Sequence, residues 1–418
     1  MRKLSLALVL FSLIISRPVE AQRRVTDLSG LVSLMLQRNP RLQAERREAD
    51  ASTRRAAAAG VLPNPSLSFG LKNVGWDRLT VGEEMMSGLD VSVSQKIPFP
   101  NKLKLSRAVA HVEASQHAQM AEETRLALVR EAKELYAKLS YYRRSHELLK
   151  EKRALLEEGL RLAEARYTVG QGTQADLFKA RVEISKTDEL LLDVQAVLAE
   201  LQARVAALLS LPPDSVEVET KALSVSTSRL EVSELLNRAQ EVNPALKRLE
   251  LEGQKAKANE SLARASFLPD FMVQAGKMFR GRYEDVYEAM VGVEVPLYFW
   301  KRERNLLLEA RLQEESAGLR IQDLRNQIAA ALHENLVAAR SAEARVALYR
   351  DKLIPQARQS LQATTSSYQV GRADFLSLLS DIESLIAYEM EYAKTLAELW
   401  MAVAKIEELT ASEILGGE

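Results

Sequence analysis

The feature that most constrains this chain is an apolar repeat running from Leu128 to Leu208. Apolar residues recur at spacings of three and four along an outgoing arm, broken only by His146 and Arg153: Leu128, Ala132, Leu135, Leu139, Tyr142, Leu149, Leu156, Leu160, Ala163 and Tyr167. After residues 168–172 the repeat runs back: Leu177, Ala180, Ile184, Thr187, Leu191, Val194, Leu198, Leu201, Val205 and Leu208. This pattern is typical of the seam of a long antiparallel helical hairpin. At about 1.5 Å per residue, an arm of some 65 residues would span roughly 100 Å.

The same pattern occurs a second time, about 200 residues later. Six apolar positions of the returning arm recur as Leu378, Leu385, Tyr392, Leu399, Ile406 and Leu409. The turn recurs too, with Tyr167-Thr168-Val169-Gly170 repeated as Tyr368-Gln369-Val370-Gly371. Asn39-Pro40 returns as Asn243-Pro244, and Leu62-Pro63 as Leu268-Pro269. The chain is therefore predicted to be two copies of one unit.

The first 21 residues are predicted to be a signal peptide outside the fold. Arg2 and Lys3 precede a short apolar run, and Val19-Glu20-Ala21 places small residues at the cleavage positions. Removing this segment leaves 54 basic and 56 acidic residues, a net charge of about −2, which argues against a nucleic-acid partner. The chain has no cysteine, so an exported protein of this kind must be held together by packing or oligomerisation.

Each repeat also carries two stretches in which apolar and polar residues alternate, the pattern of strands with one apolar face. In the first stretch Leu67, Phe69 and Leu71 alternate with serine, glycine and lysine. We expect a first repeat at 22–211 with strands at about 65–75 and 87–97 and a hairpin at 101–209. A polar linker would cover 212–229. The second repeat would occupy 230–418, with strands at about 270–280 and 287–297 and a hairpin at 301–410.

Four strands long enough to cross a bilayer cannot close a barrel, and open edges are too costly in hydrocarbon. Three copies would supply twelve strands, an even number within the range of bacterial outer-membrane barrels. Aromatic residues at the strand ends would form an interfacial belt: Trp76, Phe99, Tyr298, Phe299 and Trp300. The predicted fold is mainly α with a small β part, trimerising into a twelve-stranded barrel and a helical periplasmic tunnel. A pair of soluble periplasmic hairpins is the alternative.

These paired motifs resemble the TolC family of outer-membrane efflux ducts over essentially the whole mature chain. The resemblance implies a homotrimer in the outer membrane of a Gram-negative bacterium, with a large periplasmic part. It also implies a passive duct that receives cargo from an inner-membrane pump through a periplasmic adaptor protein. The stretch from Gln95 to Leu103 resembles the branch serving heavy-metal and cation efflux pumps. A duct for type I protein secretion remains open, because the pump chooses the cargo.

The resemblance places a gate at the two hairpin tips. Candidate gate residues are Tyr167, Gly170, Asp176, Tyr368, Gly371, Arg372 and Asp374. Asp176 matches the family aspartate of the first tip, and Tyr368 matches the family tyrosine of the second. The position of the family arginine is Ala373, with Arg372 one residue earlier, and the acidic positions read Ser377 and Ser380. An ionic latch between Arg372 and Asp176 or Asp374 is one hypothesis, and ordinary solvated turn residues are the alternative.

Nothing in the sequence indicates an enzyme or a cofactor. The four histidines have no partner at metal-site spacing, and neither a phosphate-binding loop nor a nucleophile elbow is present. Five methionines cluster near the strands: Met85, Met86, Met272, Met278 and Met290. They suit strand packing better than a soft-metal path.

Overall fold

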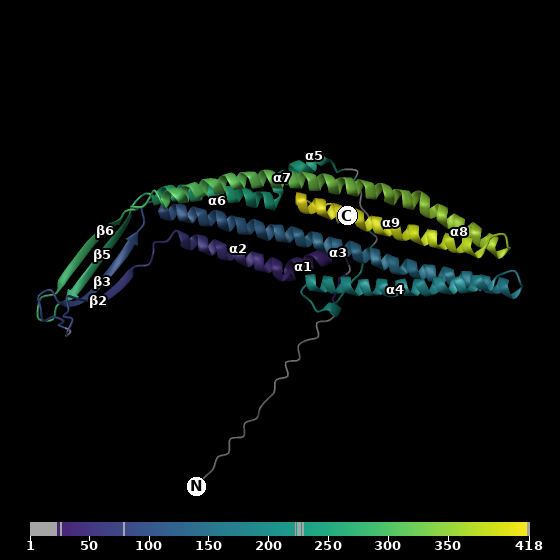
Figure 1. The fold of residues 1–418 in the computed structure, drawn as a ribbon, viewed down its shortest axis with the longest axis horizontal. Coiled ribbons are helices and arrows are strands. Elements are labelled where there is room, and N and C mark those ends of the chain that lie inside the picture. Colours follow the sequence, from purple (N-terminus) through teal and green to yellow (C-terminus); the bar gives the residue numbers. More distant parts are fainter. Residues whose placement is uncertain are drawn as a thin grey trace, which may run out of the picture.

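The computed structural model describes residues 23–25, 27–77, 80–221, 223, 227 and 230–415. The expected signal peptide, residues 1–21, lies outside the described residues. The molecule is elongated, with a small sheet at one end and the tips of the two helical hairpins at the other (Figure 1). The prediction of a mainly helical chain with a small β part is confirmed.

The two repeats share the order of two short helices, two strands and a long helical hairpin. The first contains β1 (Arg23–Val25), α1 (Leu28–Arg38), α2 (Pro40–Ala59), β2 (Ser66–Lys72), β3 (Gly88–Ile97), α3 (Lys102–Thr168) and α4 (Gln174–Leu208). A short 3-10 turn (Pro213–Ser215) and β4 (Val216–Val218) follow. The second contains α5 (Val232–Val242), α6 (Pro244–Ser266), β5 (Asp270–Phe279), β6 (Val286–Glu294), α7 (Glu303–Leu348), a π-helical turn (Tyr349–Leu353), α8 (Ile354–Gln369) and α9 (Phe375–Thr410).

The long arm α3 contacts α2, α4, α6 and α9, and it packs beside α2 and α4 at different points along its length. Near its start it packs beside α2, where Arg55 lies 3.5 Å from Glu113. Near its end it packs beside α4, where Arg153 lies 2.7 Å from Asp188. The outgoing arm has 67 residues, as its repeat predicts, but the returning arm α4 has only 35. A coiled-coil seam requires only that each stretch of apolar surface be covered, so two shorter helices serve one long arm.

The corresponding arm of the second repeat is not one uninterrupted α-helix. A π-helical turn at Tyr349–Leu353 separates α7 from α8. Pro355 lies in the first turn of α8 and has no backbone N–H to donate to the preceding turn. The helix accommodates this missing hydrogen bond through the local π-helical widening.

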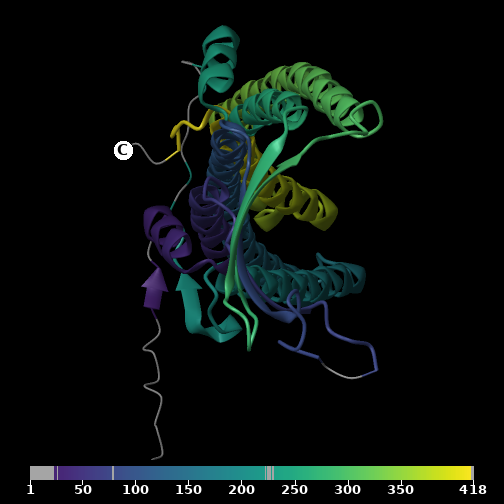
Figure 2. The same cartoon turned by 90° about the vertical axis from the view of Figure 1, so that its left-hand side faces the viewer.

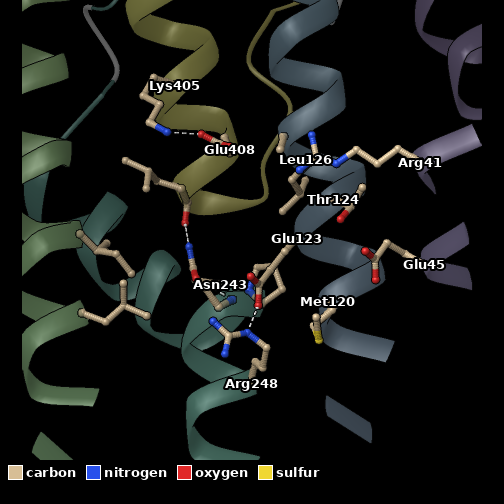
Figure 3. Close-up of a pocket in the computed structure, with 16 residues that line it drawn as sticks. Arg41, Glu45, Met120, Glu123, Thr124, Leu126, Asn243, Arg248, Lys405 and Glu408 are labelled. Carbon is tan, nitrogen blue, oxygen red and sulfur yellow. Dashed lines mark hydrogen bonds and ion pairs between the residues drawn. The ribbon is translucent and has the colours of Figure 1, made fainter. Parts of the chain in front are cut away.

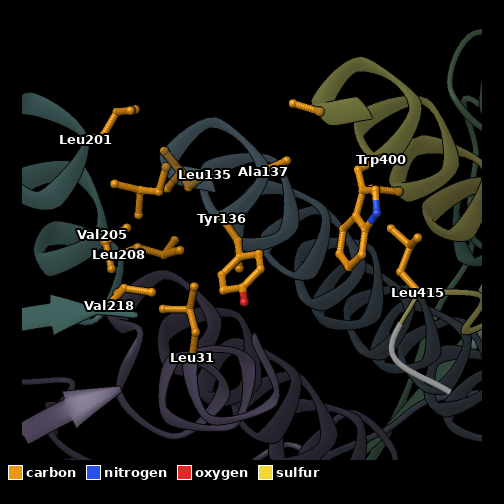
Figure 4. Packing of buried hydrophobic residues seen from close by; sticks show 14 of the residues in the cluster. Leu31, Leu135, Tyr136, Ala137, Leu201, Val205, Leu208, Val218, Trp400 and Leu415 are labelled. Carbon is orange, nitrogen blue, oxygen red and sulfur yellow. The ribbon is translucent and has the colours of Figure 1, made fainter. Parts of the chain in front are cut away.

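The largest hydrophobic core lies in the middle of the molecule, where α1, α3, α4, α9 and β4 meet (Figure 4). Tyr136 of α3 is 3% exposed and faces Trp400 of α9, with ring centroids 6.4 Å apart. Leu128, Leu135 and Leu139 from the predicted seam are all buried here. The seam therefore holds the two repeats together as well as closing its own hairpin.

The segment expected to be a polar linker contains a strand. Residues Val216–Val218 pair in parallel with Arg23–Val25, so the start of the described chain returns to the end of the first repeat. Figure 2, which looks from the sheet end, shows these two arrows side by side next to α1. Val216 and Val218 are buried while Glu217 is exposed, so the pairing places two apolar side chains in the core. A three-residue strand is too short to be recognised by alternation alone.

The other four strands form one antiparallel sheet in the order β2-β3-β5-β6, so both repeats contribute to it. Residues that pair across the sheet share a face. One face is apolar and exposed: Leu67, Phe69, Val93, Val273, Val291 and Val293 are between 43% and 72% exposed. On the other face Lys72 lies 3.0 Å from Asp90 and 2.8 Å from Glu288. The predicted alternation thus gives a two-sided sheet whose apolar side has no cover within the described chain.

The repeated Asn-Pro pair has the same role in both repeats. Asn39 accepts a hydrogen bond from the backbone N–H of Leu42 and donates its side-chain amide to the Leu208 carbonyl, 2.9 Å away. Asn243 caps α6 likewise and donates to the Leu409 carbonyl at 2.9 Å (Figure 3). Each asparagine, only 5% exposed, joins the start of one helix to the end of the returning arm. Proline follows because the first helical turn needs no N–H there.

Replacing Asn243 by alanine is expected to cost about 1–3 kcal/mol, because it removes a helix cap and leaves the Leu409 carbonyl without its donor. Thermal unfolding followed by circular dichroism should show a lower melting temperature, and Asn39→Ala should give a similar decrease. Asn305→Ala is the control, since that exposed amide donates only to Lys301, one turn back. Equal melting temperatures for Asn243→Ala and Asn305→Ala would contradict this assignment.

Candidate gate at the hairpin tips

The two hairpin tips lie together at the end of the molecule opposite the sheet (Figure 1). The first tip joins α3 to α4, and the second joins α8 to α9. A hydrophobic cluster from both hairpins runs up to the tips and includes Leu156, Ala163, Leu361, Tyr368 and Phe375. The tips are thus packed against each other within one chain.

The glycines of the two tips have nearly identical backbone geometry. Gly170 has a φ of +75° and Gly371 a φ of +80°, a left-handed conformation that side chains other than hydrogen disfavour. In each tip the residue after this glycine donates back to a helix carbonyl, Gln171 to Arg166 at 2.9 Å and Arg372 to Ser367 at 2.8 Å. This is the usual way in which a helix ends at glycine. The repeated Tyr-x-x-Gly sequence therefore specifies the turn.

The two tip aspartates are occupied in capping helices. Asp176 forms a capping box with Thr173 at the start of α4, with 2.8 Å between the Thr173 hydroxyl and the carboxylate. Asp374 accepts from the Ser377 backbone N–H at 2.7 Å, and the hydrogen bonds from Ser377 hold the pKa of this carboxyl below its usual value. Within the described chain no ion pair joins Arg372 to either aspartate, so the hypothesised latch is not formed there.

A residue outside the predicted gate set connects the two tips. Arg166, in the last turn of α3, donates to the carbonyl of Tyr368 at 2.9 Å and to that of Ala373 at 3.4 Å. It also donates to the Gln171 carbonyl at 3.2 Å, and its guanidinium lies 4.6 Å from the centre of the Tyr368 ring. Because one planar guanidinium contacts both turns, Arg166 is a direct polar link between the two tips. The one sequence signal that could have singled out Arg166 is a difference between the repeats, because the matching position of the second repeat is Ser367.

The two matching tyrosines have different environments. Tyr368 is 2% exposed, lies 5.8 Å from the Phe375 ring, and has a pKa raised by its burial. Tyr167 is 45% exposed, and Val169 and Val370 at the turns are more exposed still. The repeat symmetry is therefore broken at the tips, with one tyrosine packed between the hairpins and the other at the surface.

The described residues hold no cluster of three or more histidines, aspartates or glutamates that could bind a metal ion. His146, predicted to interrupt the seam, lies 3.3 Å from Gln195 of α4. Met278 lies against Gly88, and Met272 lies against Gly292 on the next strand, so these two side chains fill the space above glycines. None of the helices within the described ranges has an apolar stretch sufficient to cross a bilayer.

Comparison with solved structures shows which known fold the chain shares. The fold is similar to the outer membrane protein VceC from Vibrio cholerae, with a TM-score of 0.77 and 18% identity over 93% of this chain and 96% of that one. It is also similar to the CmeC outer membrane channel of Campylobacter jejuni, with a TM-score of 0.78 and 14% identity over 94% of this chain and 87% of that one. The chain thus has the fold of an outer-membrane channel.

The family follows from sequence comparison. The profile described as "Outer membrane efflux protein" matches residues 31–210 and 235–411, so the chain belongs to the outer membrane efflux protein family. The cobalt-zinc-cadmium resistance protein CzcC of Cupriavidus metallidurans is 24% identical over 406 residues, which cover 94% of this chain and 91% of that protein. The resemblance drawn from the paired motifs is confirmed, and so is the prediction that the chain is not an enzyme.

Proposed function

We propose that the chain is the outer-membrane exit duct of a tripartite efflux system. Three copies would place their sheets in the outer membrane as a twelve-stranded barrel and their helices across the periplasm as a tunnel. The observation that carries this proposal is the sheet, whose apolar face is exposed and whose edge strands β2 and β6 each have an outer edge that pairs with no other strand among the described residues. Such a sheet needs both lipid and further strands.

The dimensions and the opposite face of the sheet support this placement. The strands β3, β5 and β6 have 9 or 10 residues each, the length of a tilted transmembrane strand. The non-lipid face carries facing hydroxyls, with Ser66 3.1 Å from Ser94 and Ser68 3.0 Å from Ser92. Polar side chains of this kind suit a water-filled interior.

The helical end supports a gated opening. The hairpin tips lie at the far end from the sheet, and the Arg166 contacts hold them together (Figure 1). Helices packed along seams can shift while keeping their packing, so small changes at the tips can widen an aperture. An adaptor protein docking there would open the duct, and an inner-membrane pump would supply the energy. The similarity to CzcC supports divalent metal cations as the cargo in preference to a secreted protein.

Disulfide cross-linking tests the trimeric closure, because the chain has no cysteine of its own. Ser68→Cys in β2 is combined in turn with cysteines at Val286, Glu288, Met290 and Gly292, the β6 positions on the same face of the sheet. We expect at least one pair to give covalent dimers and trimers in membranes under oxidising conditions, and nothing larger. Non-reducing gels measure this.

The control pairs Ser68→Cys with a cysteine at Tyr287, which lies on the opposite face of β6 and should cross-link poorly. If the largest cross-linked product contains two chains, the barrel would close with eight strands, which would contradict the proposal. Absence of cross-links at every position, with the protein in the soluble fraction, would favour the periplasmic scaffold instead.

A further inference from the structure

The turn after β6 carries three consecutive aromatic side chains at the helical end of the sheet. Tyr298, Phe299 and Trp300 are 68%, 48% and 52% exposed. Their rings contact one another, with 5.2 Å between the centroids of Phe299 and Trp300 and 6.1 Å between those of Tyr298 and Trp300. The turn is fixed by backbone hydrogen bonds from Lys301 to Tyr298 and from Arg304 to Phe299, both 2.9 Å. The aromatic group is therefore presented on an ordered backbone.

Three exposed basic residues follow at once: Lys301, Arg302 and Arg304. No ion pair joins Lys301 or Arg304 to any other described residue, and Arg302 has only a 3.9 Å contact with Glu303. The nearby carboxylate of Glu294 is already engaged, 2.5 Å from Lys96. The turn thus presents uncompensated positive charge directly beside exposed aromatic rings.

The equivalent turn of the first repeat lacks the exposed aromatic group and has fewer exposed bases, with Lys104 exposed. Phe99 is half-buried and stacks on Phe271 at 6.5 Å. Lys102 is directed inward, donating to the Leu268 carbonyl and to Asp270, both at 2.7 Å. The combination of exposed rings with three neighbouring exposed bases is therefore found at the turn of the second repeat and is not required by the shared fold.

We propose that residues 298–302 and Arg304, together called the belt patch, bind the phosphate headgroup of an anionic glycerophospholipid in the periplasmic leaflet. Aromatic side chains prefer the headgroup level of a bilayer, and lysine and arginine near them bind lipid phosphate. Arginine adds a planar pair of donors that matches phosphate oxygens. The proposal rests on the proposed function, because it requires the sheet to lie in the membrane.

Fluorescence quenching by brominated lipids tests the belt patch. The chain has three tryptophans, of which Trp400 is buried in the helical core and Trp76 lies in the loop at the far end of the sheet. In a Trp76→Phe background the quenchable signal comes from Trp300. The full-length protein is reconstituted in phosphatidylcholine vesicles with a minor share of phosphatidylglycerol, and either lipid carries the bromine. Since one base near an anionic surface contributes up to about fivefold in lipid affinity, we expect about a fivefold preference for phosphatidylglycerol.

The variant Lys301→Gln/Arg302→Gln/Arg304→Gln should lose this preference while quenching by brominated phosphatidylcholine persists. The control Lys150→Gln/Arg238→Gln/Lys352→Gln removes three exposed bases of the periplasmic helices and should keep it. If the triple variant fails to insert, single Arg302→Gln and Arg304→Gln variants replace it.

The headgroup site would be overturned if both lipids quench equally with the unmodified patch, or if the preference survives loss of the three bases. Neither result would contradict the proposed function as an exit duct. Absence of quenching by either lipid would show that Trp300 lies outside the bilayer. That outcome removes both the site and the membrane placement of the sheet.

Discussion

Replacing Arg166 by alanine is expected to raise the open probability of the reconstituted channel, and with it the mean conductance, several-fold. In the described structure this guanidinium donates to Tyr368 and Ala373 of the second tip and to Gln171 of the first. A hydrogen bond from a charged group contributes about 1.5–3 kcal/mol, so losing one of these bonds shifts an open–closed equilibrium by about tenfold or more. Planar-bilayer recording measures the change directly.

Arg161→Ala is the matched control for this experiment. Arg161 lies on the same helix, its side chain is 65% exposed, and its ion pair is with Glu158 of its own helix. We expect no change in conductance from this substitution. Arg166→Lys should be intermediate, because an ammonium keeps the charge but cannot reach both turns with a rigid fork.

The hydrogen bonds by which Arg166 joins the two tips are called the Arg166 clamp. The same recordings distinguish this clamp from the ionic latch suggested by the family resemblance. A latch through Arg372 predicts that Arg372→Ala opens the channel, whereas the structure gives Arg372 no ion pair with Asp176 or Asp374 in the chain. If Arg372→Ala raises the conductance while Arg166→Ala leaves it unchanged, as Arg161→Ala is expected to do, the Arg166 clamp does not hold the channel closed. Arg372 would then form the latch with an aspartate of another chain. Asp176→Ala should act mainly on the start of α4, because it removes the capping-box bonds to Thr173 while Thr173 stays as the N-cap.

Breaking the buried ion pair between Lys133 and Glu407 should destabilise the protein by about 3–5 kcal/mol. The Lys133 ammonium lies 2.6 Å from the Glu407 carboxylate, and the two side chains are only 6% and 5% exposed. Lys133→Met leaves a buried carboxylate without its counter-charge, which is the costly outcome for such pairs. Thermal unfolding followed by circular dichroism should show a larger decrease in melting temperature than Asn243→Ala gives.

This pair also fixes the segment that follows α9. Glu407 accepts hydrogen bonds from the backbone N–H groups of Ile414 and Leu415, and Lys133 donates to the Leu415 carbonyl at 3.2 Å. Leu415 is thereby held in the central core, where it is 2% exposed (Figure 4). Lys133→Met should therefore also increase amide hydrogen exchange in residues 411–415.

Two further variants give this prediction its control. Lys405→Met removes a half-exposed lysine that pairs with Glu408 one turn away, and should cost no more than about 1 kcal/mol. The double variant Lys133→Met/Glu407→Leu removes both charges and should recover much of the lost stability, because an apolar pair of similar volume can replace a buried ion pair. A Lys133→Met protein as stable as Lys405→Met would refute the assignment.

The local pattern of the chain was sufficient to predict most of the elements. Spacing of three and four along the arms predicts the hairpins, and alternation predicts the two-faced strands. Tyr-x-x-Gly marks the C-terminal ends of helices, and Asn-Pro marks their N-terminal ends. Each of these depends on residues within a few turns of each other. The duplication then makes each weak pattern more specific, because it must appear twice in the same order.

Sequence alone determined that the chain has two repeats of long helices with strands that present one apolar face. Only the tertiary structure decided that Arg166, among the many arginines of these helices, reaches the second tip, and that Lys133 meets Glu407. These partners are separated by 202 and 274 residues. Contacts of that kind depend on the register in which the two hairpins pack, and charged residues are too frequent on these helices for spacing to single one out.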